Sequence, residues 1–171
     1  MTDFDSVIER VRAHEDSIVD APVTRERIAD VEAELGATFP AELVAFHVAI
    51  GSGEFPFGRL FSLALDPRPP QPYDVSLIRS GARPASGRVV LVEQGSCEVA
   101  EAWHALYDVA GCEHAGLVPF ADDWGGNVYC FDEAGRILFV DHEAREPEPE
   151  LVAASFAVFV EDALGGGIVE S

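Results

Sequence analysis

The sequence contains no lysine, so all 11 of its basic residues are arginine, and they stand against 31 acidic residues. A formal net charge of −20 repels the phosphates of nucleic acids and of anionic membranes, and it speeds encounters with a basic partner. A genome-wide bias toward acidic residues and arginine is the alternative explanation of the same composition. On both interpretations the charge argues against nucleic-acid binding by this chain.

Cysteine and long apolar runs are also scarce. Three cysteines at wide spacing fit a reducing compartment better than a disulfide framework. No apolar stretch approaches the roughly 20 residues of a membrane span. The N-terminus also lacks the basic segment followed by an apolar one that marks a signal peptide. We therefore expect a soluble, cytoplasmic protein that makes no membrane contact.

The order of helical and extended patterns predicts an α+β fold in a single domain over residues 1–171, a length typical of one domain. We expect Thr24 and Ser96 to cap helices and Pro40 to be the first residue of one. Because helices come first, then strands and a last helix, we expect N-terminal helices and a C-terminal helix packed on a mainly antiparallel sheet. Apolar residues recur at helical spacing in Phe4–His14, Arg25–Leu35, Pro40–Ile50, Ser96–Val109 and Ser155–Leu164.

The stretch Leu117–Glu143 predicts the centre of the sheet. Asn127–Phe131 alternates between two faces, as a half-buried strand does. Arg136–Val140 is apolar almost throughout, which predicts a strand buried on both faces. Gly135 in the joint supplies the positive φ that a short hairpin loop needs. We expect a short strand, an acidic loop at Asp122–Asn127, and a hairpin.

Weaker patterns cover the rest of the chain. Extended structure is expected around Arg59–Leu65 and Val89–Val92, and a short strand or a helical turn at Tyr73–Ile78. The many prolines between residues 66 and 84 indicate an irregular surface excursion. Glu146–Glu150 alternates glutamate with proline and indicates an extended, solvated link to the last helix.

No pattern in the chain demands catalysis. Cys97 and Cys130 have apolar neighbours, and Cys112-x-His114 lacks the spacing of a zinc site, so buried structural cysteines are favoured over metal ligands. The serines next to glycine lack the nucleophile-elbow pattern. His47 lies on the apolar stripe of its helix, which favours a hydrogen-bonded core histidine over a catalytic one. We expect no catalytic residue, no cofactor and no metal site.

Trp124 is the candidate binding residue. A tryptophan within a turn is poorly placed for the core and is enriched at interface hot spots, although its ring can also fold back as a lid over the hairpin. We expect Asp122, Asp123, Asp141 and Glu143 to form an acidic rim around it, because the start and end of a hairpin lie together. The alternatives are solvated surface charges or, for the Asp122-Asp123 pair, turn chemistry. We expect alanine at both aspartates to weaken partner binding and to leave thermal stability nearly unchanged.

Three blocks of residues form a pattern along most of the chain. The first contains Thr24, Ile28, Glu32, Leu35-Gly36, Phe39-Pro40-Ala41-Glu42, Phe46 and Gly51-Ser52-Gly53. The second contains Leu117–Asp123, Gly125-Gly126-Asn127, Tyr129–Asp132 and Val140-Asp141-His142, and the third is Ser155-Phe156-Ala157 with Phe159. In this order the blocks, which span about residues 24–164, resemble the SUKH superfamily, domains related to the yeast cell-wall synthesis regulator. The proline-rich excursion has no counterpart.

The resemblance implies an α+β domain without known catalysis. Bacterial domains of this kind are mostly immunity proteins that bind and block polymorphic toxin domains, often nucleases or deaminases, whereas fungal relatives are interaction modules of signalling. It therefore implies an intracellular immunity protein with a protein partner. A general interaction or regulatory module without a toxin is the alternative. Because a nuclease site is basic, we expect the negative chain to be steered into its groove, with an association that slows as salt rises.

Overall fold

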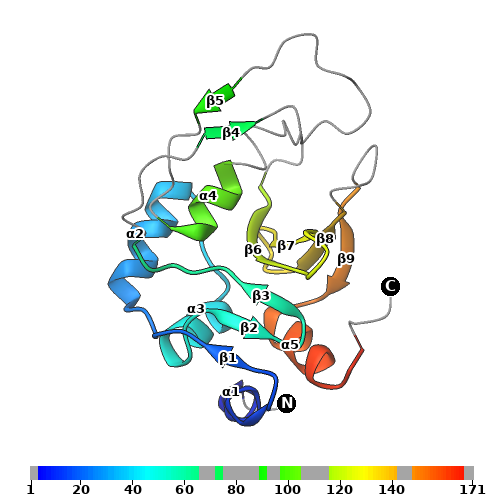
Figure 1. Cartoon of the computed structure of the whole chain (residues 1–171). Coiled ribbons are helices and arrows are strands. Elements are labelled where there is room, and N and C mark those ends of the chain that lie inside the picture. Colours follow the sequence, from blue (N-terminus) through cyan, green and yellow to red (C-terminus); the bar gives the residue numbers. More distant parts are fainter. Residues whose placement is uncertain are drawn as a thin grey trace.

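The computed structural model describes residues 4–65, 72–74, 89–91, 97–104, 116–141 and 148–167. Seven of the strands in these segments form one antiparallel sheet in the order β1-β2-β3-β6-β7-β8-β9, and β4 pairs with β5 separately (Figure 1). The predicted α+β fold is therefore confirmed. In chain order the elements are α1 (Phe4–Ala13), β1 (Ile18–Val19), α2 (Arg25–Leu35), α3 (Ala41–Ala49), β2 (Gly53–Phe55), β3 (Gly58–Leu60), β4 (Pro72–Asp74), β5 (Val89–Leu91), α4 (Glu98–His104), β6 (Val118–Asp122), β7 (Val128–Phe131), β8 (Ile137–Val140), β9 (Glu150–Ala153) and α5 (Phe156–Leu164).

Side-chain caps set the beginnings of two helices. Thr24 Oγ1 accepts a hydrogen bond from the N–H of Arg27 (3.2 Å) before α2, and Ser155 Oγ accepts one from Val158 (3.4 Å) before α5. Pro40 precedes α3 instead of being its first residue, a position where its missing N–H also costs nothing. Of the predicted helix Ser96–Val109, only residues 97–104 are described, and α4 lies there; the expected cap Ser96 lies outside the described residues. Across the described ranges, no helix qualifies as a membrane-spanning segment.

The centre of the sheet lies where the sequence predicts it. β6 is the middle strand, and β7 and β8 form the expected hairpin, with Gly135 at φ 76° in its loop. Ile137 and Phe139 of β8 contact the main core, while Leu138 and Val140 contact a second, smaller apolar cluster on the other face. Both faces of β8 are therefore at least partly covered, as its unbroken apolar run predicts.

Three short strands were not predicted. β1 and β2 lie before β3, and β9 begins at Glu150, inside the stretch that the sequence presents as a solvated link. The extended stretch expected at Arg59–Leu65 is a strand only as far as Leu60. β1 and β9 are the two edges of the seven-stranded sheet, and Ile18, Val19 and Leu151 are exposed on them. Edge strands bury few side chains, so their sequences carry little apolar pattern.

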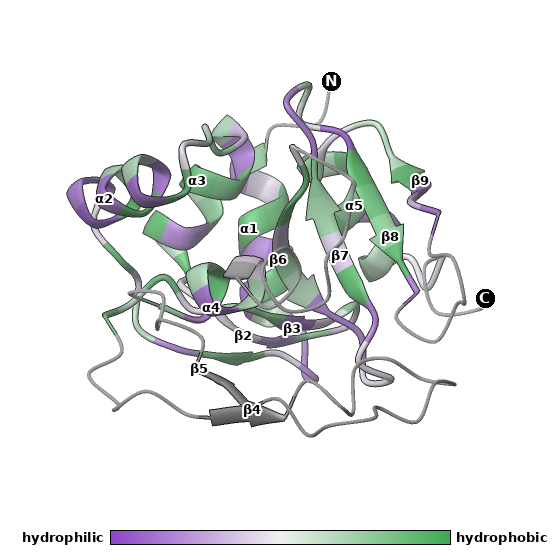
Figure 2. Ribbon diagram, turned by 90° about the horizontal axis from the view of Figure 1, so that it is seen from above, coloured by the Kyte–Doolittle hydropathy of each residue, from purple (hydrophilic) through white to green (hydrophobic). Residues whose placement is uncertain are grey.

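Aromatic rings join the helices to the sheet. Phe156 and Phe159 of α5 lie 5.7 and 5.8 Å from Phe120 of β6, measured between ring centroids. Phe156 is also 5.4 Å from Phe46 of α3, and Phe159 is 4.9 Å from Tyr129 of β7. The three phenylalanine pairs are edge-to-face, and such pairs add to the free energy gained from apolar burial. Figure 2 shows β7 and β8 as largely apolar strands, and Tyr129 of β7 belongs to this aromatic cluster.

Candidate partner-binding site

The turn between β6 and β7 is held by the carboxylate of Asp123. Its Oδ1 accepts hydrogen bonds from the backbone N–H groups of Gly125 (2.8 Å) and Asn127 (2.8 Å), and its Oδ2 accepts one from Nδ2 of Asn127 (2.9 Å). The N–H of Asp123 donates in turn to the carbonyl oxygen of Asn127 (3.0 Å). Aspartate bonded to the backbone beyond it is common turn chemistry. This turn is therefore well ordered before any partner binds.

Trp124 lies at the tip of this turn and is 67% exposed. A ring that closed over the hairpin as a lid would be largely buried, so the lid interpretation is wrong. A large aromatic side chain on an ordered turn loses little conformational entropy on docking. Trp124 is therefore available for contact with another molecule.

Strand pairing brings part of the expected acidic rim together. The antiparallel pairing of β7 with β8 places Asp141, which follows β8, at the end of the hairpin where the Trp124 turn precedes β7. Asp141 is exposed, whereas Asp122 and Asp123 are partly buried. Glu143 lies outside the described residues. Three of the four expected carboxylates thus lie at the Trp124 end of the sheet.

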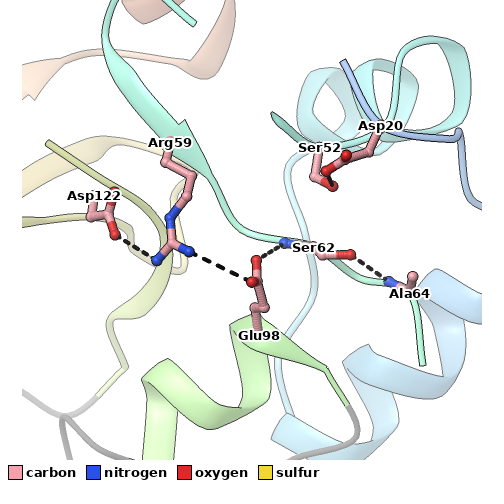
Figure 3. Close-up of polar contacts among 7 residues, drawn as sticks. All are labelled: Asp20, Ser52, Arg59, Ser62, Ala64, Glu98 and Asp122. Atoms are coloured by element: carbon pink, nitrogen blue, oxygen red, sulfur yellow. Dashed lines mark hydrogen bonds and ion pairs between the residues drawn. The ribbon is translucent and has the colours of Figure 1, made fainter. Parts of the chain in front are cut away.

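Asp122 is bound by Arg59 of β3, a residue that the sequence did not single out. Nη2 of Arg59 lies 2.8 Å from Oδ2 of Asp122, and Nη1 lies 3.6 Å from Oε1 of Glu98 on α4 (Figure 3). The other oxygen of Glu98 accepts a hydrogen bond from the N–H of Ser62 (2.8 Å). The pKa of Arg59 is raised above its ordinary value, chiefly by the hydrogen bond to Asp122. These contacts tie α4, β3 and the strand before the Trp124 turn together.

The two aspartates therefore have structural roles, and the expectation that alanine at both leaves stability unchanged does not fit the structure. Asp123 accepts three hydrogen bonds within the turn, and Asp122 forms the ion pair with Arg59. A protein hydrogen bond contributes about 1 kcal/mol net. The sequence signal for the Asp123 turn was an aspartate shortly before two glycines. No local signal pointed to Arg59, which is far from Asp122 in the chain.

The cysteines and the histidine that were considered as metal ligands or catalytic groups, and that the structure describes with their side chains, are buried. Cys97 and Cys130 are fully buried, as predicted. His47 is also fully buried, but neither ring nitrogen has a hydrogen-bond partner within the described residues, so the expected hydrogen-bonded histidine is not found. Burial lowers the pKa of His47 to about 3. Cys112 and His114 lie outside the described residues, and within the described segments no three His, Cys, Asp or Glu side chains gather into a possible metal site.

Comparison with known protein families finds a match over most of the chain. The sequence profile of the SMI1 / KNR4 family (SUKH-1) matches residues 22–162. No curated protein matches the chain. The matched range contains every element from α2 to β9 together with the Trp124 turn, and it overlaps the stretch 24–164 that carries the resemblance. The chain therefore belongs to the SMI1 / KNR4 family (SUKH-1).

Proposed function

We propose that this chain is a single-domain immunity protein that acts in the cytoplasm, where it binds a toxin domain and blocks it without catalysis. Membership of the SUKH-1 family is consistent with this role, and the family is not a known enzyme family. The partner in this proposal is a protein, not a nucleic acid or a membrane. The net charge of −20 favours a basic toxin domain, such as a nuclease or a deaminase, because opposite charge speeds encounter and selects the partner.

The exposed tryptophan on the ordered acidic turn is the observation that carries this proposal. Trp124 is 67% exposed, and the hydrogen bonds to Asp123 hold the turn that carries it. Interface hot spots are enriched in tryptophan and are commonly surrounded by polar residues that exclude water. Asp141 and the Asp122–Asp123 pair supply such a surrounding at the same end of the sheet. We therefore place the toxin contact at the Trp124 turn.

A general interaction or regulatory module without a toxin is the second candidate. The Trp124 turn suits any protein partner with a basic, partly apolar surface, so it supports both functions. The two are separated by the neighbouring genes, since a secreted toxin encoded beside this chain favours immunity.

Co-expression with the C-terminal domain of the neighbouring toxin tests the proposal. We expect the wild-type chain to restore survival and Trp124→Ala to reduce protection, because interface tryptophans typically contribute about tenfold or more in affinity. Ile18→Ala is the matched control, since Ile18 is similarly exposed at 63% but lies on β1, at the edge of the sheet. Lack of protection by the wild type would refute the function. Full protection by Trp124→Ala would refute only the site.

A further inference from the structure

Two adjoining cavities lie at the end of β7 that is opposite to the Trp124 turn. The larger, which we call the Glu133 cavity, has a volume of about 560 Å³ and lies between the C-terminal end of α2, Trp103 of α4 and the β7–β8 turn. Val118 and Phe131 contribute its apolar lining. The second, of about 540 Å³, shares Gly116, Asp132 and Glu133 with it. Volumes of this size are typical of sites that receive a ligand or a large side chain.

Both walls of the Glu133 cavity are ordered by internal hydrogen bonds. After α2, the N–H of Ala37 donates to the carbonyl oxygen of Glu32 (3.1 Å), and the N–H of Phe39 donates to Glu32 Oε1 (2.6 Å). In the β7–β8 turn, Asp132 accepts hydrogen bonds from the backbone N–H (2.9 Å) and from Nε (2.7 Å) of Arg136. A cavity with such walls exists before binding, so an occupant pays little to organise it.

Two carboxylates lie on the described part of the rim, Asp132 and Glu133, and only Asp132 has a basic partner there. Partial burial is the largest single influence on Asp132, and it raises the pKa of the carboxyl group. The hydrogen bonds to Asp132 and the charge of Arg136 together outweigh burial, so the pKa is lowered. Asp132 is therefore an ionised carboxylate paired with Arg136. Glu133 is exposed and has no hydrogen-bond or ion-pair partner among the described residues. Its Oε1 lies 3.8 Å from the position that a Cβ on Gly116 would take, so it reaches the wall that the two cavities share. α2 also ends here without a basic residue in its last turn, and the C-terminus of a helix is partially negative.

We propose that the Glu133 cavity binds an arginine side chain of the partner protein. The guanidinium group meets Glu133 and the ring of Trp103, and the apolar stem lies against Ala37 after α2, which is only partly buried. Aromatic rings attract cations, and the planar guanidinium stacks on such rings better than the compact, strongly hydrated ammonium of lysine. The inference rests on the proposed function in that it names the chemistry of the partner, and it adds a second contact at the far end of β7.

The two tryptophans of the chain allow a test that needs no toxin, because one lies at each site. Trp124→Phe leaves Trp103 as the fluorescent reporter of the cavity, and the full-length variant is titrated with Nα-acetyl-argininamide. We expect a saturable change in fluorescence, and none with the citrulline analogue, which has the same shape without the charge. Glu133→Gln should weaken binding about two- to fivefold, the range of an exposed ion pair. Glu15→Gln removes the same charge from an exposed residue beyond α1 and should leave binding unchanged.

Four results with the Trp103 reporter would each overturn the inference. These are no saturable change, an equal response to the citrulline analogue, equal weakening by Glu133→Gln and Glu15→Gln, or tighter binding of free L-arginine than of the blocked amide. The last result would assign the cavity to a small ligand instead of a protein side chain. Trp103→Phe, with Trp124 as the remaining reporter, should show no change, and a change there would place the binding on the acidic turn. The titration uses a small arginine probe instead of the toxin. Its result therefore does not depend on survival in the co-expression assay, and the two proposals can fail separately.

Discussion

His47 couples the stability of the chain to pH. His47 lies on α3 and its imidazole is fully buried, which lowers its pKa from 6.5 to about 3. In the unfolded chain the pKa returns to its ordinary value, so between pH 6.5 and about 3 the unfolded state binds a proton that the folded state does not. Above pH 6.5 the ring is neutral in both states and does not reduce the free energy of unfolding. As the pH falls below 6.5, the free energy of unfolding decreases by up to about 1.4 kcal/mol for each pH unit.

Replacement of His47 by leucine should remove this dependence. The variant keeps an apolar side chain in the core and has no ring nitrogen to protonate, so its free energy of unfolding should fall less than that of the wild type between pH 7.5 and pH 5. Chemical denaturation at several pH values measures both. Ile50→Leu is the control, since it changes another buried side chain and removes no titratable group, so the slope should stay unchanged. Parallel curves for wild type and His47→Leu would show that His47 does not set the pH dependence.

Close contact between β3 and β6 depends on Gly58. Its φ is 129°, and a Cβ at this position would collide with the carbonyl oxygen of Asp122 on β6. The same approach allows Arg59 to reach Asp122 and holds the strand that leads into the Trp124 turn. A side chain at Gly58 therefore strains the backbone and also pushes β3 away from β6.

Alanine at Gly58 should destabilise the chain more than alanine at another glycine with positive φ. Gly166, with φ 78°, has no neighbouring atom within 4 Å of the place that a Cβ would take, so Gly166→Ala should cost only the backbone strain, about 1–2 kcal/mol. Gly58→Ala should cost more than this, because the collision adds to the strain. Chemical denaturation of both variants measures the difference. Equal losses of unfolding free energy in the two variants would mean that β3 and β6 can move apart at little cost.

At the scale of elements, the sequence predicted what is strongly patterned. α2 and α5 carry apolar stripes with cap residues, and β7 and β8 carry apolar runs around a glycine loop, so local rules locate them. The edge strands β1 and β9 bury little, and their residues satisfy no apolar pattern. The Arg59 network and the Glu133 cavity join segments that are distant in the chain. Only folding brings those segments together, so no local pattern revealed either one.

For the whole molecule, the net charge bears on how fast the basic partner that we propose would reach the Trp124 turn. A net charge of −20 accelerates association with a positive surface, and salt screens this attraction over about 10 Å at 0.1 M ionic strength. Trp124 on its ordered turn then provides apolar contact area, which salt does not weaken. We therefore expect salt to slow the association more than it speeds the dissociation.

The most direct test of the proposed function is to titrate purified toxin domain with the purified chain and to follow the turnover of the toxin. We expect an equimolar amount of the chain to abolish turnover, with an onset that slows as salt is raised. Trp124→Ala should require a clear excess. Unchanged toxin turnover in the presence of excess wild-type chain would contradict the proposal that this protein binds and blocks its partner.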